Sequence, residues 1–208
     1  MLKKESQILK PFAEKPWKKY TNKEIKLQTN KKSESYTYGT LKKLAKQEIL
    51  KEEKAGNVTL YSLNTTMKAQ TYAAMTAQHT AWSKNLPYKD ITNIAKKMPA
   101  SHYTLLITGS YANGKQTPKS DIDLVIICGD AEEPKRILAE IRHSCEMNIP
   151  EIHPFAFKES EFTQMLKEKK DNYGKETAKN NLILYGGDAY YRMITGAIKD
   201  GLPDEYLP

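Results

Sequence analysis

The sequence predicts an α+β fold in three parts, and three observations lead to it. Residues 1–64 show helical spacing of apolar positions followed by a strand–turn–strand pattern, which predicts three short helices and a hairpin. Residues 65–98 carry two further helical patterns, which indicate a helical connector. Residues 99–208 begin with two apolar runs separated by a polar loop, and they predict a mixed β-sheet with covering helices.

The first two helices are predicted from capping and stop signals. A helix is expected from Ser6 to about Glu14, and Pro16 ends it because proline does not continue a helix. Thr21 and Glu24 have the spacing of a capping box, which predicts the start of a short second helix.

A third helix and a hairpin complete the N-terminal part. Ser33 or Ser35 caps this helix, whose apolar positions at helical spacing are Leu41, Leu44, Ala45 and Ile49. Residues 50–54 and 57–63 are the expected hairpin strands, joined at Ala55-Gly56. In the second strand Val58 and Leu60 alternate with Thr59 and Tyr61.

The connector is expected to be two helices. Thr65 or Thr66 caps the first, which runs to about Ser83, and Pro87 separates it from a second helix that starts near Tyr88. His79 has no partner at metal-ligand spacing and is interpreted as structural.

The most informative segment lies between the two apolar runs. The run 102–107 leads into Gly109-Ser110, and Asp121-Ile122-Asp123 opens the next run. Glycine allows a tight turn that approaches a phosphate closely, and Ser110 offers a hydroxyl and an N–H near an expected helix start. Asp121 and Asp123 lie two apart on a strand, so both carboxylates project from one face. Such a pair can hold Mg²⁺ between protein and nucleotide.

This Gly-Ser and Asp-x-Asp pattern resembles the nucleotidyltransferase superfamily that includes DNA polymerase β, and within it the minimal nucleotidyltransferases. The resemblance runs from roughly Tyr103 to Tyr191, and it includes the stretch Leu-Ile-Leu-Tyr-Gly-Gly-Asp-Ala-Tyr-Tyr-Arg at 182–192. It implies transfer of a nucleoside monophosphate from a nucleoside triphosphate, ATP by expectation, to a hydroxyl acceptor with Mg²⁺ or Mn²⁺. The order of helices and hairpin in residues 1–64 resembles a winged helix-turn-helix domain.

The resemblance also implies roles for individual residues. Asp121 and Asp123 would hold the metal, and a third carboxylate would follow the amphipathic helix expected from Glu132 to about Met147. Glu151, in a strand-like stretch over 149–155, is the best match for this carboxylate, and Glu146 is a less favoured substitute. The residues that would bind the β- and γ-phosphates, or add positive charge beside them, are Gly109, Ser110, Lys115 and Lys119.

The rest of the chain, from Glu159, is expected to form a helix, a loop and a closing helix over about 188–198. A basic helical stretch over 175–179 precedes the closing helix. Tyr190, Tyr191 and Arg192 are candidates to pack near the nucleotide, with core packing as the alternative for the tyrosines.

The charge of the chain favours an anionic partner. Lys and Arg number 33 against 25 Asp and Glu, for a formal net charge of +8. In a winged helix the third helix would face a DNA groove, and its contact candidates are Lys31, Lys32, Tyr36, Tyr38, Lys42 and Lys43. The alternatives are a solvated helix face and a protein-docking surface.

Two cysteines, Cys128 and Cys145, lack metal-ligand or redox spacing. No signal-peptide pattern and no long apolar stretch is present, so a cytoplasmic protein without a membrane partner is expected. The expected partners are a nucleotide, duplex DNA and a protein acceptor, as in toxin–antitoxin pairs; a homodimer is a further option. The acceptor could equally be an RNA end or a small molecule. The alternative function is a DNA-binding regulator whose nucleotidyltransferase-like domain senses nucleotide without catalysis.

Overall fold

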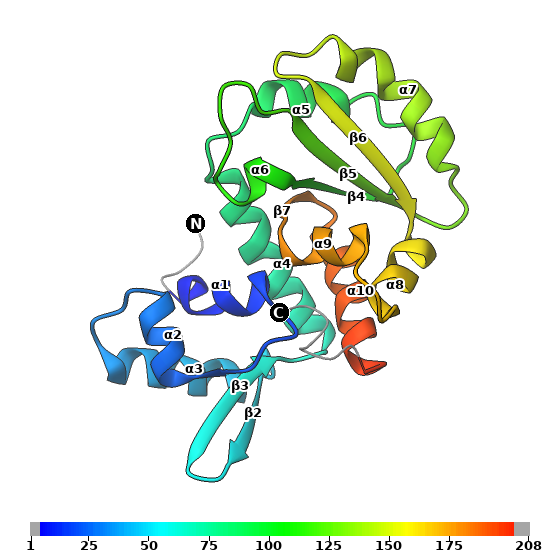
Figure 1. Cartoon of the computed structure of the whole chain (residues 1–208). Helices are drawn as coiled ribbons and strands as arrows, with labels where there is room; N and C mark the ends of the chain where they lie inside the picture. Colours follow the sequence, from blue (N-terminus) through cyan, green and yellow to red (C-terminus); the bar gives the residue numbers. More distant parts are fainter. Residues whose placement is uncertain (1–4, 202–208) are drawn as a thin grey trace.

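The computed structural model describes residues 5–201, and two β-sheets organise it (Figure 1). The N-terminal unit, residues 6–63, contains three helices and a small sheet of strand order β1-β3-β2. Its elements are α1 (Ser6–Glu14), β1 (Tyr20–Thr21), α2 (Asn22–Gln28), α3 (Glu34–Lys46), β2 (Leu50–Ala55) and β3 (Val58–Leu63).

A long helix, α4 (Met67–Trp82), leads from this unit to a four-stranded sheet with helices on both faces. The remaining elements are α5 (Tyr88–Ala95), β4 (Tyr103–Thr108), α6 (Gly109–Ala112), β5 (Ile122–Cys128), α7 (Pro134–Glu146), β6 (Ile152–Lys158), α8 (Glu159–Lys167), α9 (Tyr173–Lys179), β7 (Leu182–Tyr185) and α10 (Gly187–Lys199). The strand order is β6-β5-β4-β7, with β5 and β6 parallel and the other two pairs antiparallel. No helix of the described residues is both long and apolar enough to cross a membrane.

The predicted helix starts in the N-terminal unit are confirmed. Thr21 Oγ1 accepts a hydrogen bond from the Glu24 backbone N–H at 3.2 Å, and the Glu24 carboxylate accepts one from the Thr21 N–H at 2.7 Å. Ser33, rather than Ser35, caps α3 by accepting from the Tyr36 N–H. The prediction that Ile49 belongs to this helix was wrong: α3 ends at Lys46, and Ile49 is buried in the turn that follows.

The hairpin is confirmed, but its turn differs from the prediction. Ala55 pairs with Val58, so the turn is Gly56-Asn57 rather than Ala55-Gly56. Val58 is 47% exposed, whereas Tyr61 and Leu63 are buried. The predicted alternation is present, and the face of β3 that carries Tyr61 and Leu63 is turned toward the core.

Two strands near the C-terminal end also differ from expectation. The strand expected over 149–155 begins at Ile152 and continues to Lys158. Pro154 is tolerated because β6 lies at the edge of the sheet, where a missing backbone donor leaves no gap in the ladder. Leu182 to Leu184, for which no strand is predicted, lie in the edge strand β7 against β4.

Buried side chains form one cluster on each face of the four-stranded sheet. Leu105, Ile107 and Leu124 face one side, where α5 and α7 cover them. Leu106, Val125 and Ile127 face the other, in a cluster that also takes in residues of α1, α4, α8 and α10. The strict alternation along β4 and β5 follows from the period of two in a strand. The N-terminal unit thus shares a core with one face of the sheet.

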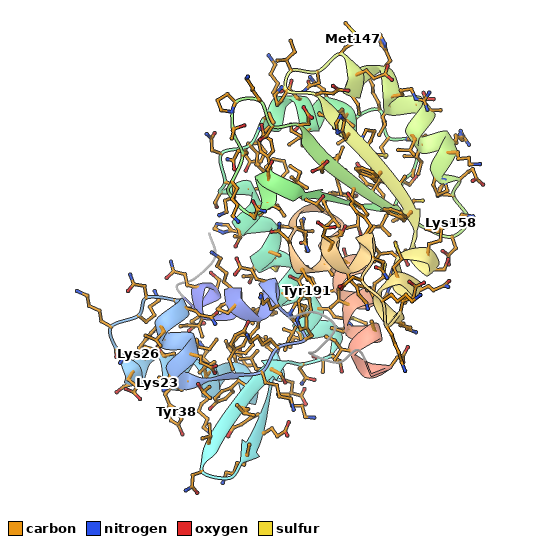
Figure 2. The ribbon with its side chains drawn as sticks, in the orientation of Figure 1. Lys23, Lys26, Tyr38, Met147, Lys158 and Tyr191 are labelled. Carbon is orange, nitrogen blue, oxygen red and sulfur yellow. The ribbon has the colours of Figure 1, made fainter. Side chains whose placement is uncertain are left out.

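A buried tyrosine joins the N-terminal unit to the last helix. The Tyr191 hydroxyl donates a hydrogen bond to the Ala13 carbonyl oxygen at 2.6 Å, from α10 to α1. Figure 2 shows Tyr191 where these two parts of the molecule meet. Burial raises the pKa of the Tyr191 phenol far above its usual range, so the group remains a neutral donor.

Replacing Tyr191 with Phe should lower the free energy of unfolding by about 1–2 kcal/mol, because the change removes a buried hydrogen bond and keeps the ring. Urea denaturation measures this difference. Tyr72→Phe is the control, since Tyr72 on α4 is exposed and its replacement should be nearly neutral. Equal stabilities of the two variants would show that the contact between α10 and α1 contributes little.

Candidate active site

The turn after β4 brings a carboxylate against the backbone. Gly109 has a φ of +66°, a conformation that glycine adopts without strain. A Cβ on residue 109 would overlap Asp123 Oδ2, so the turn and this carboxylate occupy adjoining space only because residue 109 has no side chain. Asp123 is held there by the β4–β5 ladder, in which it pairs with Thr108.

A pocket of about 100 Å³ opens at this contact. We call it the Asp123 pocket, and its walls are Thr108, Gly109, Asp123, Tyr173, Glu176, Thr177 and Asn180. One wall is the end of β4 and the start of β5. The other wall is α9, more than fifty residues further along the chain, and the segment just after it. The site is therefore assembled by tertiary packing.

One polar group in the Asp123 pocket has no hydrogen-bond partner. Thr177 is 1% exposed, and its Oγ1 finds none among the described residues. By contrast, Asn180 Nδ2 donates to the Gly109 carbonyl at 3.4 Å, and the hydroxyls of Thr108 and Tyr173 are 3.5 Å apart. Buried hydroxyls are nearly always satisfied, so an orphaned one in a pocket wall is available to a water molecule or to a polar ligand.

Two carboxylates act on the same phenol in this pocket. Burial is the main reason that the pKa of Tyr173 is raised, and the hydrogen bond with Thr108 opposes the shift. The negative charges of Asp123 and Glu176 raise it further. Tyr173 is therefore a neutral phenol at neutral pH, and the charges of Asp123 and Glu176 both act on it.

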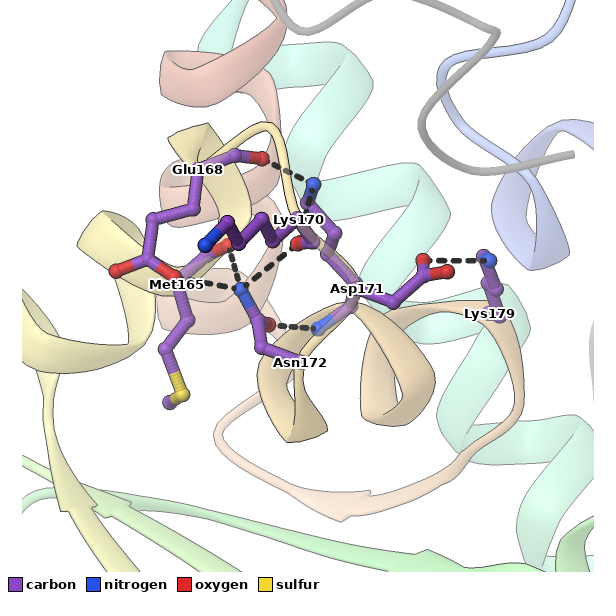
Figure 3. Close-up of polar contacts among 7 residues, drawn as sticks. Met165, Glu168, Lys170, Asp171, Asn172 and Lys179 are labelled. Carbon is purple, nitrogen blue, oxygen red and sulfur yellow. Dashed lines mark hydrogen bonds and ion pairs between the residues drawn. The ribbon is translucent and has the colours of Figure 1, made fainter.

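The start of α9 is fixed by the loop that precedes it (Figure 3). The Asn172 side chain accepts from the Lys175 backbone N–H at 3.0 Å and donates to the Met165 carbonyl at 2.8 Å. The Lys175 side chain is buried, and its ammonium donates to the backbone carbonyls of Glu168 and Lys170. These bonds fix the helix that carries Glu176 and Thr177.

The other predicted carboxylates lie at the starts of β5 and β6. Asp121 is exposed and directly precedes β5, whereas it was expected on the strand itself. Glu151 is also exposed and directly precedes β6, where its backbone carbonyl accepts from the Ile122 N–H at 2.9 Å. Glu151 Oε1 is 3.6 Å from His153 Nε2, and His153 pairs with Asp123 in the parallel ladder. Neither Asp121 nor Glu151 is a wall of the Asp123 pocket.

Within residues 5–201, no three His, Cys, Asp or Glu side chains gather in an arrangement that could hold a metal ion. Such a cluster is not a requirement for Mg²⁺. This ion is commonly bound through one or two carboxylates, with substrate phosphates and water completing its octahedral shell.

The predicted phosphate-binding residues surround the turn. Ser110 is half-buried in the short helix α6, next to Gly109. Lys115 and Lys119 are exposed in the loop that joins α6 to β5, and this loop is shaped by its own hydrogen bonds, including one from the Lys115 N–H to the Ser110 carbonyl at 2.9 Å. The side chains of Lys115 and Lys119 therefore extend from a structured loop beside the turn.

The predicted DNA contacts lie on the N-terminal unit, at the far end of the molecule from the four-stranded sheet, as the position of Tyr38 in Figure 2 shows. Lys32, Tyr36 and Tyr38 are exposed. The other three contact side chains of the unit: Lys31 donates to Gln7, Lys42 pairs with Glu52 at 2.5 Å, and Lys43 pairs with Glu5 at 2.8 Å. The hydrogen bonds to these carboxylates raise the pKa of Lys42 and of Lys43.

Other residues singled out in the sequence have structural positions. Tyr190 and Tyr191 are buried in the core, and Arg192 forms an ion pair with Glu159 at 3.0 Å. Cys128 and Cys145 are buried free thiols, and burial raises the pKa of Cys145 to about 11, which keeps it an inert thiol.

Glu176, Thr177 and Asn180 were missed as site residues. The sequence shows them only as part of a basic helical stretch, and no local spacing connects them to Gly109 or Asp123. The signal that could have found them is the apolar run at 182–184. Had it been taken as a strand beside β4, the residues just before it would have been placed at the same edge as the Gly-Ser turn.

A comparison with protein families covers the part of the chain that forms the Asp123 pocket. Residues 89–184, somewhat less than half of the chain, match the sequence model of a family described as "Nucleotidyltransferase domain". A solved structure described as "Crystal structure of the toxin-antitoxin with AMP-PNP" is 16% identical, with a TM-score of 0.40, and covers 58% of this chain and 92% of that one. A likeness at that level carries no argument here. No curated protein matches the chain.

Gly109→Ala should abolish nucleotide binding, because the added methyl group would displace the Asp123 carboxylate. Gly114→Ala is the matched control. Residue 114 also has a positive φ, +70°, but nothing lies within 4 Å of its Cβ position. Both variants pay about 1–2 kcal/mol of backbone strain, and only the first disturbs the pocket. Calorimetric titration with ATP and Mg²⁺ measures the difference, and equal binding by both variants would argue against this pocket as the site.

Proposed function

We propose that this chain is a Mg²⁺-dependent nucleotidyltransferase that moves a nucleoside monophosphate from a nucleoside triphosphate, ATP by expectation, to a hydroxyl acceptor. The observation that supports this most directly is the Asp123 carboxylate set against the Gly109 turn, in a pocket with an orphaned Thr177 hydroxyl. These residues lie within the matched nucleotidyltransferase domain.

In this reaction the acceptor oxygen bonds to the α-phosphorus of the triphosphate. The bond from that phosphorus to the oxygen shared with the β-phosphate breaks, and pyrophosphate leaves with the electron pair. The acceptor proton passes to a carboxylate of the site. Most of the rate enhancement in such reactions comes from positioning and from neutralising phosphate charge.

The turn supplies the groups that would receive the triphosphate. The Gly109-Ser110 backbone can approach phosphate oxygens closely because residue 109 has no side chain, and Ser110 adds a hydroxyl. Lys115 and Lys119, exposed on the following loop, add positive charge near the leaving pyrophosphate.

Asp121 and Asp123 would hold Mg²⁺ together with the phosphates of the nucleotide. Two protein carboxylates fit this ion, whose shell phosphates and water complete. When bound, the ion neutralises charge that develops on the phosphate oxygens.

Two residues compete for the role of the carboxylate that takes the acceptor proton. Glu151 directly precedes β6, the strand beside β5, and its carbonyl accepts from Ile122 within the Asp-x-Asp segment. Glu176 is a wall of the Asp123 pocket and acts electrostatically on the same phenol as Asp123. Both are exposed, so either can be replaced by Gln without disturbing the core.

Asp123→Asn should abolish transfer and weaken Mg²⁺-dependent ATP binding, while thermal unfolding stays near that of the wild type. Of Glu151→Gln and Glu176→Gln, the one that removes the base should lower transfer on the order of 10²-fold and keep most ATP affinity. Pyrophosphate release measures the rates. Full activity of Asp123→Asn would exclude the proposed reaction.

A second function is favoured by one observation, the position of Glu151, the expected third carboxylate, which is not a wall of the Asp123 pocket. A regulator that senses nucleotide would bind ATP through the same turn without transferring it. Measurements on the wild-type protein distinguish the two functions. A sensor binds ATP with Mg²⁺ but releases no pyrophosphate with any acceptor fraction, whereas the enzyme releases it stoichiometrically with product.

We further propose that the N-terminal unit is a winged helix that binds duplex DNA through α3. The order α1-β1-α2-α3-β2-β3 and the β2–β3 hairpin support this. The exposed side chains of Lys32, Tyr36 and Tyr38 would be available to DNA, while the ion pairs of Lys42 and Lys43 would have to exchange a carboxylate for a phosphate. Exposed ion pairs of this kind contribute little stability, so the exchange costs little.

Lys32→Gln combined with Lys42→Gln should weaken duplex DNA binding and reduce the slope of log affinity against log salt by about 0.9 for each lost phosphate contact. Fluorescence anisotropy over a salt series measures the slope. Lys89→Gln with Lys135→Gln, on α5 and α7, removes the same charge elsewhere and should leave the slope unchanged. If both pairs change binding equally, only the net charge matters and α3 is not the DNA surface.

A further inference from the structure

A second pocket lies on the other side of Asn180, between the N-terminal unit and the four-stranded sheet. It has a volume of about 200 Å³, and we call it the basic pocket. Its charged walls are Lys10 and Glu14 on α1, Lys15 just after α1, Lys84 just after α4, and Lys179 at the end of α9. The proposed function gives this pocket no role.

The basic pocket has an excess of positive charge. Lys10 pairs with Glu14 at 3.5 Å, and Lys179 pairs with Asp171, outside the pocket, at 3.7 Å (Figure 3). Lys15 and Lys84 form no ion pair with any other residue in the range 5–201. Four ammonium groups against one carboxylate create a positive potential, which favours an anionic ligand.

The basic pocket borders the candidate active site. Asn180 is a wall of both pockets, and its side-chain amide donates to the Gly109 carbonyl. Ala112, another wall, ends the short helix that begins at Gly109. A ligand in the basic pocket therefore lies next to the turn at which the triphosphate is proposed to bind.

The sequence positions of the lysines in the basic pocket indicate which of the two substrates binds there. Lys10, Lys15 and Lys84 lie outside residues 89–184, the matched domain that contains the whole Asp123 pocket. None of the three is a wall of the Asp123 pocket, so they are free to contact a second substrate beside the nucleoside triphosphate. Positively charged grooves that follow a phosphate backbone are the usual way to bind single-stranded nucleic acid.

We propose that the basic pocket binds the phosphate backbone of a single-stranded RNA end, whose terminal hydroxyl is the acceptor. This rests on the proposed function for the identity of the reaction. The hydroxyl oxygen would attack the α-phosphorus, extend the strand by one nucleotide and release pyrophosphate. Binding of the strand, however, requires no transfer and can be measured without it.

The test uses the full chain and a short fluorescent RNA oligonucleotide, with anisotropy recorded over a salt series. Lys15→Gln combined with Lys84→Gln should weaken binding roughly tenfold at low salt and reduce the salt slope by about 0.7 for each lost contact. The matched control is again Lys89→Gln with Lys135→Gln, which removes equal charge from exposed positions on the other face of the sheet. Calorimetry with ATP and Mg²⁺ on the same proteins should give unchanged affinity.

Three outcomes would overturn this assignment: no RNA binding by the wild type at low salt, equal losses in both double variants, or weakened ATP binding in Lys15→Gln/Lys84→Gln with RNA binding intact. The last outcome would assign the lysines to the triphosphate instead. Failure of the proposed reaction is distinguishable from failure of this assignment. If the protein transfers no nucleotide, pyrophosphate release is absent, but Lys15→Gln/Lys84→Gln still weakens RNA binding and the control pair does not. Duplex DNA binding should not respond to them, which separates this pocket from α3.

Discussion

Asp123 reaches the turn after β4 because residue 109 has no side chain. The antiparallel ladder fixes the aspartate opposite Thr108, and the positive φ of Gly109 folds the chain back so that its backbone meets the carboxylate. Any Cβ at this position would fill the space that the carboxylate occupies. A phosphate and the ion that accompanies it can approach both groups at once only under this constraint, so the chemistry that we propose depends on one missing methyl group.

The second requirement of the site is α9. Its residues close the Asp123 pocket on one side, and the residue pair at its end, Lys179 and Asn180, forms part of the basic pocket on the other. The buried side chain of Lys175 and the cap at Asn172 fix the start of this helix. Because α1 packs against α4 and is bonded to Tyr191, the N-terminal unit contributes walls to the basic pocket as well as a separate exposed surface on α3. Under these proposals the N-terminal unit would have two functions: α3 would bind duplex DNA, and α1 would help to bind the acceptor strand.

Local signals in the sequence predicted most of the elements, and the errors have physical causes. The Thr21 and Ser33 caps depend on residues three apart, so a single sequence reveals them, and the Gly-Ser and Asp-x-Asp pattern lies between two strands that are adjacent in the chain. By contrast, the Leu182–Leu184 run is too short to distinguish a strand from a loop until its partner β4 is known. Thr177 and its neighbours join the site only through packing across the sheet, which no spacing records. The division into domains at 1–64, 65–98 and 99–208 remains a prediction. Buried side chains from all three segments belong to one core, so packing does not mark these boundaries.

The central claim is that the Asp123 pocket transfers a nucleoside monophosphate. The most direct measurement incubates the full chain with Mg²⁺, a cell-derived RNA or protein fraction, and nucleoside triphosphates labelled either on the α-phosphate or on the γ-phosphate. The account predicts that the α-label appears in the acceptor fraction, that the γ-label appears only in released pyrophosphate, and that both signals vanish with Asp123→Asn. Transfer of the γ-label to the acceptor, or no transfer of either label from any of the common triphosphates, would contradict it.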